Sequence, residues 1–150
     1  SRPGPAGQAP LRIVGGIGMS MAICYEIAYG ELVRELSADA GLLATISNDT
    51  WFGDSIGPSQ HLQIAQMRSV ELARPLLRAT NDGVTAFVDH RGRIIGRLPR
   101  FEPGALRGTV QPRAGLTPYA RWGSWPVLLL MLLLLLPALL DRRRASRTQT

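Results

Sequence analysis

The chain has 150 residues, enough for one domain with one hydrophobic core. Its net charge is +6, but four Arg and one Asp lie in the last ten residues, so the remaining chain offers no basic cluster for binding nucleic acid. The single Cys excludes an internal disulfide, and one Cys with two separated His residues lacks the ligand spacing of a zinc site.

The chain begins with a linker and a strand–helix–strand pattern. Residues 1–10 are rich in Pro and Gly, which predicts a flexible linker. Residues 18–23 alternate in the β manner, residues 30–38 place apolar side chains on one helical face, and residues 42–47 form a short apolar run typical of a buried strand. A loop is predicted at 48–53.

A longer helix is predicted at 59–74, with Ser59 as its N-cap and Pro75 as its end. Its buried side is expected to carry Leu62, Ala65, Val70 and Ala73.

Strands separated by Gly-containing turns follow at 76–80, 84–89 and 93–98. A further strand is predicted at 105–110. Alternating strands and helices followed by hairpins indicate a layered α/β domain over residues 11–118.

The end of the chain has the pattern of a membrane anchor. From residue 122 to residue 140 there are 19 uncharged residues, which as a helix would extend roughly 28 Å, close to the thickness of a bilayer core. Aromatic residues lie at one end of this segment and Arg residues at the other. We therefore predict a transmembrane helix at 119–140 and a basic cytoplasmic tail at 141–150, with the globular part outside the cytoplasm.

Cys24 directly follows the first predicted strand, at a sheet edge where loops form active sites. A lone Cys is more often a small buried hydrophobe, so position alone leaves its role open. Glu26 would face the same side as Cys24 in an extended segment and could orient a base, position substrate or be a surface acid. His61 and His90 have no adjacent carboxylate in the sequence, and both are expected to be solvated surface residues.

The loop at 47–53 combines Asn48 and Asp49 with the aromatic residues Trp51 and Phe52. Such a mixture suits a pocket for an acyl chain and a carbonyl group. The alternative is that the two aromatic residues cap the hydrophobic core.

Five segments together resemble the apolipoprotein N-acyltransferase family, a membrane branch of the nitrilase (carbon–nitrogen hydrolase) superfamily. They are AICYEI (22–27), TISNDTWFG (45–53), SIGPSQH (55–61), ELARPLLRATN (71–81) and GLTPYAR (115–121). The resemblance implies the C-terminal part of a nitrilase-type αββα sandwich, facing the bacterial periplasm, followed by one transmembrane helix in the inner membrane.

The resemblance also implies a ping-pong acyl transfer without metal or cofactor. Cys24 would attack the acyl ester of a membrane phospholipid and form a thioester. The α-amino group of the lipid-modified N-terminal Cys of an apolipoprotein would then accept the acyl chain. By similarity, Tyr25 and Glu26 support the site, and the backbone N–H after Cys24 donates to the oxyanion. The resemblance implies that the loop residues Asn48, Trp51 and Phe52 bind substrate. The enzyme is expected to be a monomer.

The family's catalytic triad is Glu, Lys and Cys, and its Glu and Lys precede the Cys by many residues. The 23 residues before Cys24 contain no acid, and the chain contains no Lys. The resemblance therefore implies that this chain is an incomplete C-terminal portion, inactive by itself. Two alternatives remain: a nitrilase-type amidase that uses water as acceptor, and a non-catalytic membrane-anchored domain.

Overall fold

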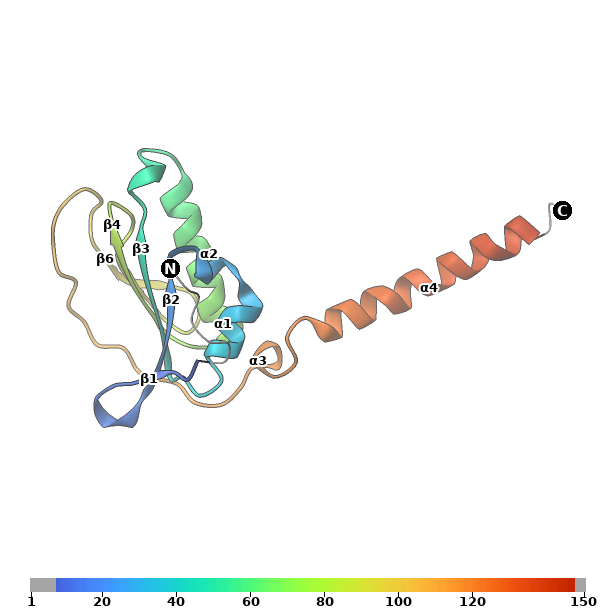
Figure 1. Ribbon diagram of the computed structural model, residues 1–150, viewed down its shortest axis with the longest axis horizontal. Helices are drawn as coiled ribbons and strands as arrows, with labels where there is room; N and C mark the ends of the chain where they lie inside the picture. Colours follow the sequence, from blue (N-terminus) through green and yellow to red (C-terminus); the bar gives the residue numbers. More distant parts are fainter. Residues whose placement is uncertain (1–7, 148–150) are drawn as a thin grey trace.

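The structure is a computed structural model that describes residues 8–147, with the side chains described as far as residue 137. Figure 1 shows an α/β domain from which one long helix extends. The layered α/β class predicted from the sequence is confirmed, since strands and helices alternate in the first half of the domain and hairpin strands follow.

In residues 8–147, six strands form one mixed sheet in which each strand pairs with its neighbours in chain order. The three central strands are parallel and the remaining pairs are antiparallel. Parallel pairing of β2, β3 and β4 brings their carboxyl ends to the same edge of the sheet. The strands are β1 (Leu11–Arg12), β2 (Gly18–Ile23), β3 (Leu42–Asn48), β4 (Leu76–Asn81), β5 (Ala86–Val88) and β6 (Ile94–Arg97).

The predicted strand at 105–110 is wrong, because the structure has no strand there. Gly108 interrupts this stretch, and Pro103, Gly104 and Pro112 flank it; these residues weaken or block strand pairing. It runs over the sheet instead, and a Cβ built on Gly108 would lie 2.8 Å from the ring of Phe87. Glycine is therefore required where the chain passes over this ring.

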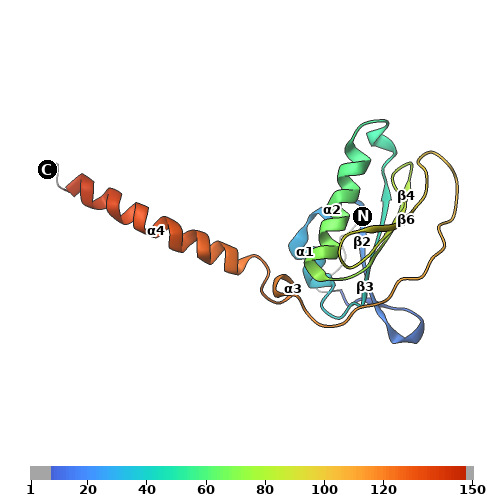
Figure 2. The ribbon, with the colours of Figure 1, turned by 180° about the vertical axis from the view of Figure 1, so that it is seen from behind.

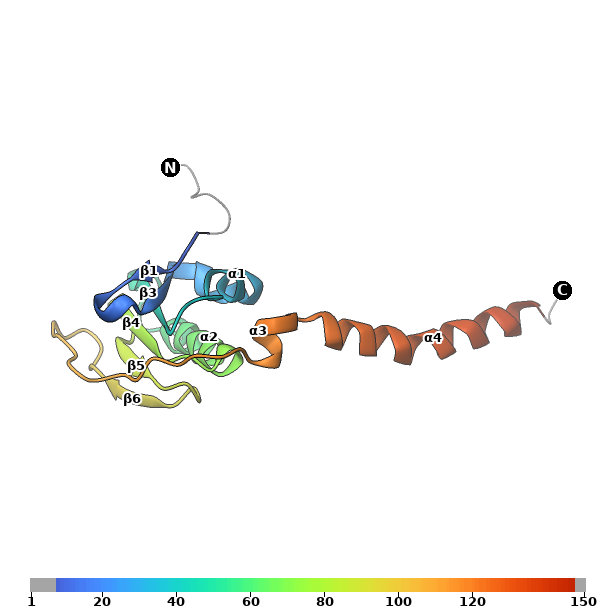
Figure 3. The same cartoon turned by 90° about the horizontal axis from the view of Figure 1, so that it is seen from below.

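Helices α1 and α2 lie on one face of the sheet (Figure 3). The predicted helix at 30–38 is confirmed by α1, whereas α2 begins before Ser59, which is therefore not its cap. Pro58 occupies the first turn of α2, where its missing N–H costs nothing. The helices are α1 (Gly30–Leu36), α2 (Gly57–Leu72), α3 (Pro118–Trp122) and α4 (Trp125–Arg147), with the 3₁₀ turns η1 (Val14–Gly16), η2 (Cys24–Ala28) and η3 (Thr50–Phe52).

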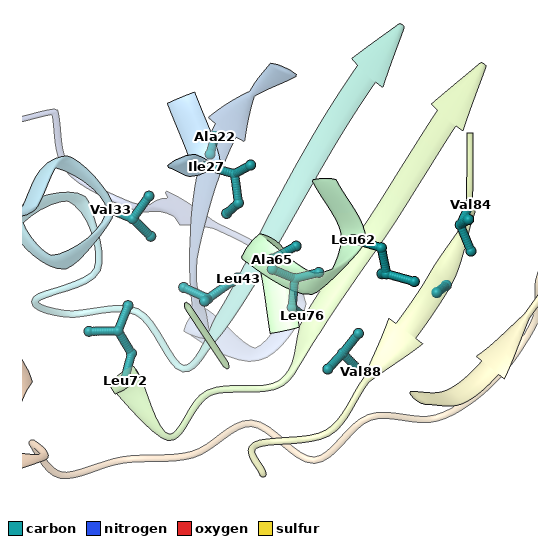
Figure 4. Packing of buried hydrophobic residues seen from close by; sticks show 11 residues of the cluster. Ala22, Ile27, Val33, Leu43, Leu62, Ala65, Leu72, Leu76, Val84 and Val88 are labelled. Atoms are coloured by element: carbon teal, nitrogen blue, oxygen red, sulfur yellow. The ribbon is translucent and has the colours of Figure 1, made fainter. Parts of the chain in front are cut away.

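The hydrophobic core lies between these two helices and the sheet (Figure 4). Leu43 and Leu76 are opposite each other in β3 and β4, and both are almost fully buried. Leu62 and Ala65 cover them from α2, as predicted, but Val70 is 49% exposed. Val70 follows the inward-facing Ser69 by one residue, and one residue turns a helix by about 100°.

The second face of the sheet is only partly covered. The strand residues that alternate with the core positions point to this second face. Two of them, Ile23 and Ile46, are register partners and are 58% and 48% exposed. The segment around Ala105 and Leu106 lines a hollow over this face, together with Leu77 and Phe87. The described residues thus form one sheet with one helical layer.

Helix α4 extends away from the domain (Figure 2). Its side chains from Trp125 to residue 137 are all exposed. Within the part of the chain whose side chains are described, no helix is long and apolar enough to cross a membrane. Residues 1–7 of the predicted linker, the side chains at 138–140 and those of the predicted basic tail lie outside the described residues.

Candidate active site

Cys24 is the first residue of η2, directly after β2, and it adopts a left-handed backbone conformation with a φ of 53°. Holding a residue other than glycine in this conformation costs on the order of 1–3 kcal/mol, and such strain is concentrated at functional sites. A sharp turn between a strand and a helix exposes the side chain of the turning residue at the sheet edge, which is the geometry of a nucleophile elbow. Cys24 is half-buried, and its Sγ lies 3.6 Å from Ser47 Oγ.

Glu26 does not share an extended segment with Cys24, so that part of the sequence interpretation is wrong. The chain turns into η2 at Cys24, and Glu26 Oε2 accepts a hydrogen bond from the backbone N–H of Ile23 at 2.7 Å. The carboxylate therefore stabilises the turn that carries Cys24. Tyr25 is exposed and packs edge-on against Tyr29, with ring centroids 5.8 Å apart.

The three predicted loop residues have different environments. The Asn48 side-chain oxygen accepts hydrogen bonds from the backbone N–H and the hydroxyl of Thr50, so it shapes the loop. Trp51 is 76% exposed, whereas Phe52 is half-buried with its ring centroid 6.4 Å from that of His61. Only Phe52 of the two aromatic residues lies against the buried part of the site.

A buried polar cluster lies beneath Cys24, formed by Asp49, His61 and Arg78. Asp49 Oδ1 lies 3.0 Å from His61 Nδ1, and Asp49 Oδ2 accepts a hydrogen bond from Arg78 Nη2 at 2.7 Å. Ser47 Oγ donates its single hydrogen to Asp49 Oδ1. All three members of the cluster are at most 4% exposed. Burial lowers the pKa of Arg78, and the charge and hydrogen bond of Asp49 oppose this effect.

The expectation that His61 is a solvated surface residue is therefore wrong. Its carboxylate partner lies twelve residues earlier, beyond a loop, and a search for an adjacent acid misses it. Arg78 could have been recognised from the sequence, because it follows the buried Leu76 by two residues in β4 and therefore lies on the same face of the strand. An Arg at an inward strand position needs a buried acceptor.

The Cys24 carbonyl oxygen determines that His61 Nε2 carries a hydrogen. Nε2 lies 3.3 Å from the backbone oxygen of Cys24, and a carbonyl oxygen only accepts hydrogen bonds, so Nε2 must carry the hydrogen. Nδ1 then either donates to Asp49, in a charged ring, or accepts from Arg78 Nη2 at 3.1 Å, in a neutral ring. In both cases His61 holds the backbone of Cys24 rather than its sulfur.

The carbon–nitrogen hydrolase family model matches residues 3–119. The chain belongs to the carbon–nitrogen hydrolase family. Curated relatives at 51–55% identity are named apolipoprotein N-acyltransferase; that of Azotobacter vinelandii is 55% identical over 144 residues, which cover 96% of this chain and 28% of the relative. The chain thus spans about a quarter of the length of the curated relatives that it matches.

Solved structures of carbon–nitrogen hydrolases share the fold. The enzyme of Helicobacter pylori G27 superposes with a TM-score of 0.60 at 15% identity, over 68% of this chain and 43% of its own. A variant amidase of Nesterenkonia sp. AN1 has a TM-score of 0.50 at 27% identity, over 67% and 40% of the two chains. That structure contains the acetamide moiety of fluoroacetamide covalently added at the active-site cysteine.

Proposed function

We propose that this chain is the C-terminal portion of an apolipoprotein N-acyltransferase in which Cys24 is the nucleophile. The observation that carries the proposal is the strained backbone of Cys24 at the carboxyl edge of the parallel strands. The names of the curated relatives and the covalently modified cysteine of the similar amidase support it. In the turn at Cys24, the Glu26 carboxylate supports the backbone. Tyr25 offers its exposed ring and its backbone N–H to the substrate.

In the proposed reaction, the Cys24 thiolate attacks the carbonyl carbon of a phospholipid acyl ester. A bond forms between sulfur and carbon, the ester C–O bond breaks, and the lysophospholipid oxygen leaves with a proton. The α-amino group of a diacylglyceryl-cysteine at the N-terminus of an apolipoprotein then attacks the thioester. An amide forms, the amine loses a proton, and the thiol is regenerated. The family's general-base Glu and its Lys would come from the part of the enzyme that precedes this chain.

The oxyanion of each tetrahedral intermediate needs hydrogen-bond donors. Tyr25 N–H is among the first N–H groups of η2, which have no acceptor within their own helix. It follows the nucleophile directly, so we place the substrate oxygen against it. Asn48 ends β3, and Trp51 and Phe52 lie in η3, which follows it; the exposed ring of Trp51 suits an acyl chain.

The partly exposed face of the sheet fits an αββα sandwich. Ile23, Ile46 and Leu77 offer an apolar surface that packs on a second sheet in that arrangement, at about 10 Å between sheets. We infer that the preceding part of the enzyme supplies this second sheet with its helices.

We also infer that the apolar part of α4, from Trp125 to residue 140, crosses the bacterial inner membrane and places the domain in the periplasm. Both proposed substrates are lipids, so an anchored enzyme meets them at the membrane surface. A hollow at the base of α4 is lined by Trp122, Trp125 and Leu129 together with Arg34 and Arg121. Aromatic rings beside Arg side chains suit the boundary between lipid tails and anionic headgroups.

The test is to trap the thioester. The full-length enzyme, incubated in detergent with a phospholipid that carries a labelled acyl chain, should retain the label on Cys24. The label should be released by hydroxylamine and absent from Cys24→Ser, and a lipopeptide with a free N-terminal amine should accept it. An unlabelled Cys24 would contradict the proposal, and release to water alone would favour an amidase. The 150-residue chain by itself should show no turnover.

A further inference from the structure

The peptide unit between Cys24 and Tyr25 links the nucleophile to the proposed oxyanion donor. In the described residues every peptide bond is trans. In a planar trans peptide the carbonyl oxygen and the following N–H point in opposite directions. Any group that holds the Cys24 carbonyl therefore also sets the direction of the Tyr25 N–H.

His61 is that group. Its Nε2–H donates to the Cys24 oxygen at 3.3 Å from the buried side of the turn. The Tyr25 N–H consequently points away from the buried cluster, toward the open edge of the sheet. Because Cys24 has a strained left-handed φ, its peptide unit needs such an external contact to keep one orientation.

The surroundings of His61 keep its ring in place. Asp49 follows β3, His61 lies in α2 and Arg78 lies in β4, so three elements meet at Nδ1. Phe52 and Tyr25 lie next to the ring, each with its centroid 6.4 Å away. Asp49 and Arg78 are both 1% exposed, so their hydrogen bonds are protected from water.

We propose that His61 is a positioning residue that aims the Tyr25 backbone N–H at the developing oxyanion, with Asp49 and Arg78 holding its ring. The proposal rests on acyl transfer through Cys24 and adds that His61 acts through the backbone. It does not make His61 the base of the thiol, because its Nε2–H is directed at a carbonyl oxygen, and the contact that the structure gives Cys24 Sγ is Ser47 Oγ at 3.6 Å.

Two substitutions separate the roles of the two ring nitrogens. The amide nitrogen of His61→Gln is as many bonds from Cβ as Nε2, so it can still donate to the Cys24 oxygen. The amide nitrogen of His61→Asn matches Nδ1 instead and cannot reach that oxygen. The full-length enzyme, its Cys24→Ser form and both variants are compared by thermal unfolding, by the rate of thioester formation and by the rate of Cys24 alkylation with iodoacetamide.

Thioester formation passes through an oxyanion, whereas alkylation at a saturated carbon does not. His61→Asn should slow thioester formation about 100-fold, the usual effect of losing one oxyanion donor, and change alkylation less than about threefold. His61→Gln should form the thioester within about tenfold of the wild type and keep its pH profile. The KM for phospholipid should be nearly unchanged in both variants.

Several results would overturn the proposal: equal losses of alkylation and acylation, equal thioester rates for the Asn and Gln variants, or loss of a limb of the pH profile in His61→Gln. If His61→Asn does not fold, the rate and pH profile of His61→Gln decide alone. A wild-type enzyme that forms no thioester would refute the proposed function, whereas a wild-type rate in His61→Asn would refute only the role of His61.

Discussion

The sheet face beneath α1 and α2 buries different chemistry at its two ends, although the same strands form both. Toward the start of β3 and β4, Leu43 and Leu76 pack with other aliphatic side chains. Toward their carboxyl ends, the same face carries Arg78 with Asp49 and His61. The apolar end is stabilised by area removed from water, which tolerates small changes of shape. The polar end depends on directional bonds, each of which fails if one partner is removed.

The change between the two ends occurs over two residues along β3 and β4. Leu43 pairs with Leu76, and two residues further along Thr45 pairs with Arg78. A buried ion pair is a weak source of stability, because the loss of hydration cancels most of the attraction. The polar end is therefore explained better by the geometry that it gives Cys24 than by the stability it adds.

The largest effect on stability is expected from Arg78→Met, which leaves Asp49 buried without its cation. Removal of one partner of a buried pair typically costs about 3–5 kcal/mol. Urea unfolding of the full-length enzyme in detergent measures the loss. The double variant Arg78→Met with Asp49→Leu is the control, and it should recover most of the stability but not the thioester rate. A loss below about 1 kcal/mol in the single variant would contradict this view of the cluster.

A smaller effect is expected at the apolar end, from Leu43→Ala. Leu43 is 1% exposed, so the substitution leaves a cavity and should cost about 2–4 kcal/mol. Thioester formation per folded molecule should be unchanged, because Leu43 pairs with Leu76 at the apolar end, two residues before the pair that contains Arg78. Val70→Ala is the matched control at an exposed site of α2 and should change stability by less than about 0.5 kcal/mol. A slower thioester rate in Leu43→Ala would show that the two ends are coupled.

The smallest effect is expected at the boundary. Thr45 is 1% exposed, and its hydroxyl has no hydrogen-bond partner among the described residues. Thr45→Val removes this hydroxyl at nearly constant shape and should stabilise the protein by about 1 kcal/mol. Thr85 provides the opposite case, because its hydroxyl accepts from Thr80 N at 3.1 Å, and Thr85→Val should destabilise by a similar amount. Thermal unfolding compares the two, and a loss of stability in Thr45→Val would reveal an unrecognised partner.

Local patterns in the sequence were sufficient for most of the fold. Alternating or apolar runs predicted β2, β3 and β4, and the end of β2 placed Cys24 at the sheet edge. The same reasoning was wrong at 105–110, where it predicted a strand, and at Val70, which it placed on the buried side of α2.

Sequence reasoning also missed most of the buried cluster under Cys24. Asp49 and His61 are twelve residues apart and Arg78 lies 29 residues from Asp49, so no short motif contains them. Their contact requires the parallel pairing of β3 with β4 and the return of the chain into α2.

The sequence by itself determined the α/β class, the order of the central strands and helices, and the position of Cys24 at the end of a strand. These features depend on side-chain periodicity and turn chemistry within a few residues, which can be recognised in a linear chain. Only the folded structure determined the left-handed backbone of Cys24, the hydrogen bond that Ile23 N–H donates to Glu26 and the contact of His61 with the Cys24 carbonyl. These features depend on which distant groups meet away from water, where leaving a buried donor or acceptor without a partner costs free energy.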